Sequence, residues 1–258
     1  MNSASLIYRI SQWATILLLA FGLSGCASTA TSEQAKTIAK KPLITDPLEP
    51  FNRTMYAFNK GVDKVVVKPL AEGYQAVTPA PVRNSVGNFF TNIEDVSVFA
   101  NKVLQAKFND AGNTLARLTV NTTLGVLGLF DVATKMGIEK EQADFGQTLY
   151  TWGVKRSQYL VLPILGPTTV RDGIPGKTVD YFLSVWDFAS YEVQIAAFSL
   201  YALHVRSTYL EQEDILESAF DEYAFVRDIY IQRRKVTLSG SNDITDWDQD
   251  LINEHEVY

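Results

Sequence analysis

The chain has 258 residues, of which 47% are hydrophobic and 20% are charged, and its formal net charge at pH 7 is −6. This composition is typical of a folded globular protein and not of a disordered one, and the negative charge argues against binding nucleic acid. The single cysteine excludes an intramolecular disulfide and a metal site built from several thiolates.

The N-terminus has the features of a lipoprotein export signal. Arg9 precedes an uncharged apolar run over 13–23, which suits the hydrophobic region of a signal peptide and is too short to span a bilayer. Two small residues then precede Cys26, and the sequence "LSGC" resembles the bacterial lipobox, whose cysteine thiol is acylated after cleavage. We therefore expect a signal peptide over 1–25 and lipidation of Cys26, with an incidental thiol beside an ordinary cleavage site as the alternative. In that class an aspartate after the cysteine favours inner-membrane retention, so Ala27 favours the outer membrane.

Both ends of the mature chain differ in composition from its middle. Residues 26–45 are mostly small and polar, which predicts a lipidated N-terminus followed by a flexible tether. At the other end, the 241–258 segment has six acidic residues and no Lys or Arg, so we predict an acidic, solvated tail over 237–258. One folded domain is expected between them, over 46–236.

The middle of the chain is predicted to be mostly helical, which makes the fold class all-α. Phe51, Met55 and Phe58 share one helix face, and Pro69 is predicted to end that helix. Residues 192–205 are apolar nearly all round, which suits a buried core helix or a face turned to acyl chains. No uncharged apolar run in the mature chain reaches the ~20 residues that cross a membrane as a helix, so we expect the domain in the periplasm or within one leaflet.

The sequence predicts no catalytic residue, no metal and no cofactor, although a metal held by carboxylates stays open. Its two histidines, His204 in an apolar helix and His255 in the acidic tail, are in poor settings for catalysis, and the G-x-S-x-G, H-E-x-x-H and P-loop motifs are absent. Asp46 and Glu49 could be paired acids, but the neighbouring prolines favour a turn into a helix N-terminus. The "RDG" at 171–173 could hold a catalytic aspartate and is more typical of a turn with a local ion pair.

Two apolar runs are broken by glycine or proline. Gly125 and Gly128 interrupt the run over 123–133, which predicts a tight helix contact or an apolar, membrane-dipping bend. The 159–172 run contains Pro163, Gly166 and Pro167, and we interpret it as a shaped loop.

Four segments, "DPLEPFNRTMYAFN", "NTTLGVLGLFDVA", "DFGQTLYTWGV" and "LPILGPTTVRD", together resemble the VacJ-like lipoprotein family, also called the MlaA family. The resemblance covers about residues 46–235. It implies a ring-like amphipathic helical domain in the inner leaflet of the outer membrane, on the periplasmic side, with a polar channel. It further implies removal of mislocalised phospholipids from the outer leaflet, transfer to a soluble periplasmic lipid-carrier protein, association with a trimeric porin, and no enzymatic activity.

The same resemblance suggests which residues belong to the channel or to the family motifs. Asn52 and Asn59 are predicted to face the channel, Phe51 to pack or face lipid, and Gly125 and Gly128 to lie in a gating loop, with structural turns as the alternative. A non-transporting lipoprotein that scaffolds an envelope complex, and a lipid-cleaving enzyme, remain rival functions. The full set of channel or motif residues is Asp46, Pro47, Glu49, Pro50, Phe51, Asn52, Arg53, Asn59, Gly166, Pro167, Arg171 and Asp172.

Overall fold

The structure, a computed structural model, describes residues 44–239. The predicted signal peptide and Cys26 lie outside the described residues, as do most of the predicted tether and acidic tail. The described region is mostly helical, which confirms the predicted fold class, and it also contains one small sheet. Its α-helices are α3 (Glu49–Val62), α4 (Lys68–Val77), α5 (Ala80–Leu104), α6 (Phe108–Thr123), α7 (Val132–Lys135), α8 (Phe145–Thr151), α9 (Lys177–Phe182), α10 (Tyr191–Tyr209), α11 (Glu213–Glu217) and α12 (Glu222–Ser239).

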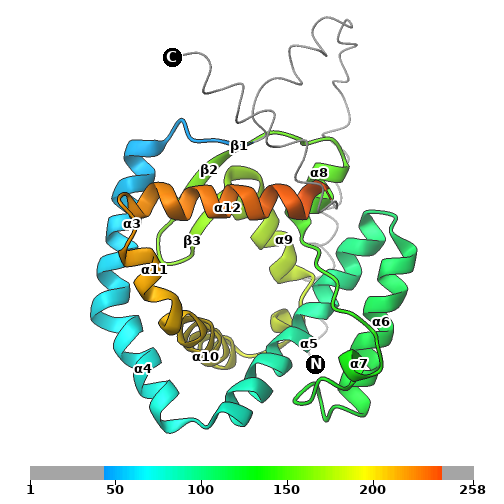
Figure 1. Cartoon of the computed structure of the whole chain (residues 1–258). Helices are drawn as coiled ribbons and strands as arrows, with labels where there is room; N and C mark the ends of the chain where they lie inside the picture. The colour runs from blue at the N-terminus through cyan, green and yellow to red at the C-terminus, as the bar shows by residue number, and fades with distance from the viewer. Residues whose placement is uncertain (1–43, 240–258) are drawn as a thin grey trace, which may run out of the picture. The chain divides into compact units, whose positions relative to one another are not determined.

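The helices form a ring-like arrangement (Figure 1). α3, α4 and α5 follow one another along an arc, and α12 spans from α3 at one end to α8 at the other. α6 packs along the outer side of α5, while α9 and the sheet lie towards the middle of the ring. Proline occupies one of the first two positions of α3, α4 and α5, where its fixed φ suits a helix. At the free N-termini of α3 and α5 its missing N–H also leaves no helical hydrogen bond unmade.

The first helical segment does not end where the sequence predicted. α3 passes into a π-helical turn, Asp63–Val67, and this turn continues directly into α4, with Pro69 near the start of the second helix. The prediction that Pro69 ends the helix was therefore wrong, because a proline is tolerated in the first turn of a new helix after the wider π-turn.

A three-stranded sheet replaces part of the loop structure expected from the sequence. β1 (Ile44–Thr45) pairs in parallel with β2 (Ser157–Leu162), and β2 pairs antiparallel with β3 (Gly166–Thr169). The "LPILGP" segment, interpreted as a shaped loop, is thus the turn of a β-hairpin. Ile164 and Gly166 have positive φ there, and glycine adopts that conformation without steric cost.

The apolar core is small and lies where the sheet meets α3 and α12. Ile44, Tyr159, Val161 and Tyr223 form it, and Tyr230 packs against it from α12. Many of the other buried side chains are polar or charged, which is unusual for a protein interior in water.

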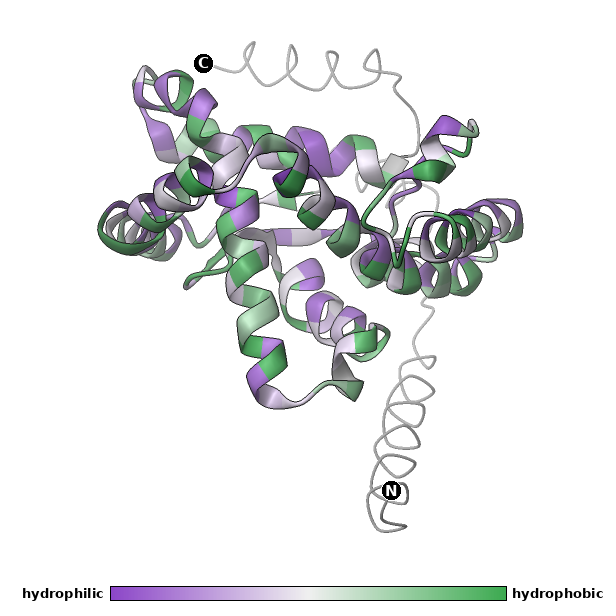
Figure 2. Cartoon of the chain, turned by 90° about the horizontal axis from the view of Figure 1, so that it is seen from below, coloured by the Kyte–Doolittle hydropathy of each residue, from purple (hydrophilic) through white to green (hydrophobic). Residues whose placement is uncertain are grey.

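Large apolar side chains lie instead on the outside. α10 projects away from the layer of α3, α4 and α5, and hydrophobic residues recur along it (Figures 1 and 2). Ser207 is its one fully buried residue, whereas Val193, Ile195 and Phe198 are about half exposed. The buried-core alternative for this segment was therefore wrong. Within residues 44–239, no helix has the length and hydropathy required to span a bilayer.

Candidate functional site

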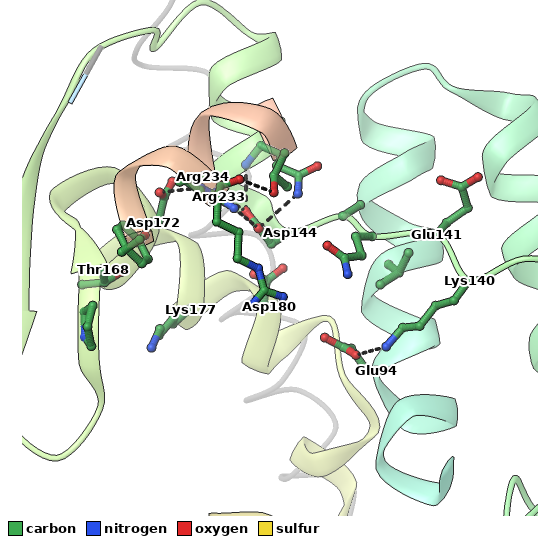
Figure 3. A pocket seen from close by; sticks show the side chains of 17 residues that line it. Glu94, Lys140, Glu141, Asp144, Thr168, Asp172, Lys177, Asp180, Arg233 and Arg234 are labelled. Carbon is green, nitrogen blue, oxygen red and sulfur yellow. Dashed lines mark hydrogen bonds and ion pairs between the residues drawn. The ribbon is translucent and has the colours of Figure 1, made fainter. Parts of the chain in front are cut away.

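A polar cavity of about 460 Å³, here called the chamber, opens between α5, α9, β3 and α12 (Figure 3). The segment before α8 forms another wall. Charged and amide side chains dominate its lining, and the elements that contribute them are far apart in the sequence. The charged lining residues are Glu94, Lys140, Glu141, Asp144, Asp172, Lys177, Asp180, Arg233 and Arg234.

Arg234 of α12 holds one wall of the chamber together. Its guanidinium donates to both carboxylate oxygens of Asp144, at 2.5 and 2.7 Å, and to Asp172 at 2.8 Å. Asp144 also caps α8 by accepting from the backbone N–H of Gln147 at 2.8 Å. These bonds fix the C-terminal half of α12 against α8 and against the π-helical turn Asp172–Gly176.

Arg171 completes this cluster from the buried side. It is 4% exposed and donates to Asp172 at 2.7 Å, which is the local ion pair expected of "RDG". Burial alone would raise the pKa of Asp172, but hydrogen bonds and charges from Arg171 and Arg234 hold that pKa below its usual value. Removing one partner of such a buried pair typically costs about 3–5 kcal/mol.

Gly146 lets these groups approach each other. A Cβ on this residue would lie 2.1 Å from Asp172 Oδ1 and 2.7 Å from Arg234 Nη2. No larger side chain fits without separating the ion pair, so the glycine of "DFGQTLYTWGV" has a steric reason that the sequence alone did not reveal.

An apolar groove of about 550 Å³ adjoins the chamber. The rings of Phe90, Trp186 and Tyr201 pack along it at tilted angles, with the Phe90 ring centroid 6.1 Å from that of Trp186 and 5.0 Å from that of Tyr201. Ile195 and Phe198 of α10 supply more of the lining. The groove and the chamber lie side by side, because five residues line both: Glu94, Ala143, Asp144, Lys177 and Asp180.

Asp180 and Lys177, one turn apart on α9, stand at this junction. Burial raises the pKa of Asp180 to about 6, although its carboxylate accepts from Asn101 Nδ2 at 2.7 Å and from the Phe145 N–H at 3.0 Å. Lys177 lines both cavities and is exposed to solvent there, while neighbouring protein removes part of its hydration and lowers its pKa.

The first of the four quoted segments, "DPLEPFNRTMYAFN", lies away from the chamber and joins α3 to α12. Asp46 accepts from Asn52 at 2.8 Å and from the Tyr223 hydroxyl at 2.5 Å, so it links chain segments instead of capping α3, whose N-cap is Leu48.

Arg53, in the same segment, makes a second link between α3 and α12. It donates to Glu49 at 2.8 Å and to Asp221 at 2.7 and 3.1 Å, beside the start of α12. Pro47 lies in the turn before α3, Pro50 in its first turn, and Phe51 is 47% exposed.

Asn52 and Asn59 both bond the hairpin. Asn52, fully buried, donates to Tyr159 O at 3.1 Å and accepts from Val161 N at 2.9 Å. Asn59 donates to Leu162 O at 2.9 Å and accepts from Ile164 N at 2.7 Å. Neither belongs to the lining of the chamber or the groove, so their contacts are structural, and a place beside the passage stays a prediction.

The last of the four quoted segments, "LPILGPTTVRD", does reach the chamber. Pro167 and Asp172 line it, Arg171 supports Asp172 from behind, and Gly166 starts β3 with φ +75°. The structure thus brings part of this motif to the site and leaves the first motif at the α3–α12 junction.

Gly125 and Gly128 lie in a strained apolar loop between α6 and α7. Val126 and Leu127 adopt positive φ, which is rare for such residues, and both are more than half exposed. Gly128 has φ +87°, and a Cβ there would lie 2.4 Å from the Cβ of Asn92. The run is therefore an apolar bend packed on α5, and its gating role stays a prediction.

Histidine and acidic side chains are the groups of the described residues that could bind a metal. No three His, Cys, Asp or Glu side chains of residues 44–239 are grouped as a metal site requires. His204 packs edge-on against Tyr74, 6.5 Å between ring centroids, and is outside the linings of both cavities. Burial lowers the pKa of this histidine.

Comparison with known proteins agrees with this architecture. The model of the family described as MlaA lipoprotein matches residues 44–237. The chain belongs to the MlaA lipoprotein family. It is 33% identical over 222 residues to the "Intermembrane phospholipid transport system lipoprotein MlaA" of Escherichia coli K12, an alignment that covers 84% of this chain and 85% of the relative.

Two further comparisons extend this relationship within the MlaA family. The Haemophilus influenzae protein with the same description is 30% identical over 224 residues, covering 84% of this chain and 86% of the relative. A solved chain described as "Structural basis for maintenance of bacterial outer membrane lipid asymmetry" is 30% identical, with a TM-score of 0.68, and covers 75% of this chain and 99% of that chain.

Several residues of the site were missed by the sequence analysis. Asp144 and Gly146 fall inside a quoted segment, and an Asp before a helical stretch was a usable sign of an N-cap at Asp144. Lys177, Asp180 and Arg234 had no local sign, because their role depends on contacts between distant segments.

Proposed function

We propose that this protein is an outer-membrane lipoprotein that removes mislocalised phospholipids from the outer leaflet and thereby maintains lipid asymmetry. The observation that carries the proposal is that a polar chamber adjoins an apolar groove and shares lining residues with it. A phospholipid has the same two parts, a charged headgroup and apolar chains. The descriptions of the Escherichia coli and Haemophilus influenzae relatives as phospholipid-transport lipoproteins support it.

The distribution of apolar surface supports a position within one leaflet. Val65 and Val77 are 75% and 81% exposed, while charged groups such as Asp95 and Arg117 are buried. Large exposed apolar patches commonly mark contact with a membrane or a protein partner. In the inner leaflet of the outer membrane the same surface contacts acyl chains, and the polar interior offers the headgroup an alternative to hydrocarbon, where an unpaired charge is costly.

Anchoring and partners complete the proposal. Residues 1–25 act as the signal peptide, Cys26 carries the lipid, 26–45 form the tether, 46–236 the transport domain and 237–258 the acidic tail. The domain works on the periplasmic side, beside a trimeric porin, and passes lipid to a soluble periplasmic carrier protein. Moving a phospholipid forms and breaks no covalent bond, so the proposal includes no enzymatic step.

The decisive experiment measures surface phospholipid with a membrane-impermeant amine label on intact cells. Cells lacking the gene are complemented with wild type or Cys26→Ala, at matched protein levels. We expect more labelled phosphatidylethanolamine after deletion and restoration only by the acylatable form. Unchanged labelling after deletion would overturn the transport proposal and favour the scaffold, whereas lysophospholipid release by purified protein would favour the lipid-cleaving enzyme.

A further inference from the structure

Two cations of the chamber have no partner among the residues that the structure describes. The other basic side chains of the lining are paired: Arg234 with Asp144 and Asp172, and Lys140 with Glu94 at 2.7 Å. Lys177 and Arg233, by contrast, have no ion pair or side-chain hydrogen bond within residues 44–239, and Figure 3 draws both among the lining side chains.

All but one of the acids of the chamber already have a cationic partner. Glu141 pairs with Lys102 at 2.8 Å, and Glu94, Asp144 and Asp172 have the partners named above. The remaining acid, Asp180, has its pKa raised to about 6 by burial, so it is mostly ionised at pH 7, and its carboxylate accepts from two neutral donors, Asn101 Nδ2 and the Phe145 N–H. Lys177 and Arg233 together therefore outweigh Asp180 by one positive charge in the chamber, although the whole protein is negative.

The position of Lys177 is also suited to an anionic ligand. Lys177 lines both the chamber and the groove, so its ammonium stands where a headgroup would meet its acyl chains. In a phospholipid that place is occupied by the phosphodiester. We propose that Lys177, assisted by Arg233, binds the phosphate of a phospholipid whose chains lie in the groove of Phe90, Trp186 and Phe198. This inference rests on the proposed function and gives its substrate a defined orientation.

The energetics favour an anionic ligand over a permanent internal partner. Loss of hydration lowers the pKa of Lys177, and a phosphodiester beside it restores a favourable field for the ammonium form. Hydrogen bonds between an ammonium and a phosphate are charge-assisted and stronger than neutral ones. Removal of one such bond corresponds to roughly a tenfold loss of affinity.

The test uses the mature protein in a phosphate-free detergent. Trp152 and Trp247 are replaced by Phe, so that Trp186 in the groove reports fluorescence. The probes are phosphatidylethanolamine with a brominated acyl chain, which quenches tryptophan on contact, and diacylglycerol with the same chains and no phosphate. Lys177→Gln is compared with Lys177→Arg and with Lys135→Gln, which makes the same charge change at an exposed site outside both cavities.

We expect the unmutated protein of this background to bind the phospholipid more tightly than the diacylglycerol, by roughly tenfold. Lys177→Gln should remove most of that preference, Lys177→Arg should keep most of it, and Lys135→Gln should keep all of it. Equal quenching by both lipids before any change at Lys177 would overturn the phosphate site while leaving lipid binding intact. Absence of quenching by either lipid would count against the proposed function as well.

A separate arm distinguishes a lipid headgroup from free phosphate. Inorganic phosphate is titrated into the same protein by calorimetry, without brominated lipid. We expect no measurable binding, because the groove contributes only when acyl chains are present. Tight binding of inorganic phosphate that Lys177→Gln abolishes would overturn the assignment to a phospholipid.

Discussion

Replacing Asn52 separates a structural role from a role in the passage. The side chain is fully buried, and in Asn52→Ala the carbonyl of Tyr159 and the N–H of Val161 lose their bonds to it. A buried polar group left without a partner costs about 1–3 kcal/mol, so two such groups correspond to about 3 kcal/mol. For a domain of this size, 1 kcal/mol shifts the melting temperature by about 2–4 °C, and we therefore expect a decrease of roughly 6–12 °C.

The assay is thermal unfolding in detergent, followed by near-UV circular dichroism, together with surface labelling of cells grown well below the new melting temperature. Asn113→Ala is the matched control, because Asn113 lies exposed on α6, and its effect on the free energy of unfolding should stay within about 0.5 kcal/mol. If Asn52→Ala left the melting temperature unchanged and abolished lipid clearance, the structural interpretation would be refuted and the channel-facing prediction supported.

Three other perturbations test the local geometry. Gly128→Ala forces a Cβ to within 2.4 Å of Asn92 at φ +87°, so it should lower the free energy of unfolding by about 1–3 kcal/mol, measured by thermal unfolding; an unchanged melting temperature would contradict the packed bend. Gly146→Ala separates Arg234 from Asp172 and should lower the free energy of unfolding by about 3–5 kcal/mol, measured in the same way. Its control is Gly112→Ala, where a Cβ meets nothing within 4 Å. Asp180 has a folded pKa of about 6, above its unfolded value, so its ionisation destabilises the fold as pH rises from about 4 to 6. The melting temperature of Asp180→Asn, measured relative to wild type, should therefore increase over this pH range. Parallel pH profiles of the two melting temperatures would refute the raised pKa.

The parts of the fold that follow from local periodicity could be predicted from the sequence. The helix that contains Phe51, Met55 and Phe58 repeats its apolar residues at helical spacing, and α3 forms there. The hairpin could not be predicted, because "YLVL" is a short apolar run that suits a strand, a loop or a buried helix equally. Its strand character depends on pairing with β1 and on the amide bonds from Asn52 and Asn59, which lie over 100 residues away.

The candidate site was predictable only where a motif and a cavity coincide. Arg171 and Asp172 are adjacent in the sequence, and their ion pair followed from that adjacency. Arg234 lies 90 residues from Asp144, and no periodicity connects the two. The resemblance to a family supplied the kind of site, while the residues that line it depend on tertiary contacts.

The placement of charge explains how one domain can offer a polar surface to a headgroup and an apolar surface to acyl chains. Arg234 and Arg171 neutralise the acids of the chamber wall through fixed bonds, so the wall stays polar without repelling an anion. Lys177 is left unpaired where the apolar groove begins. A headgroup entering the chamber therefore meets a surface that is polar throughout but attracts phosphate at one place, the place from which its chains can remain among Phe90, Trp186 and Phe198. If each cation of the lining had an acidic partner, the chamber would hydrate a headgroup without orienting it.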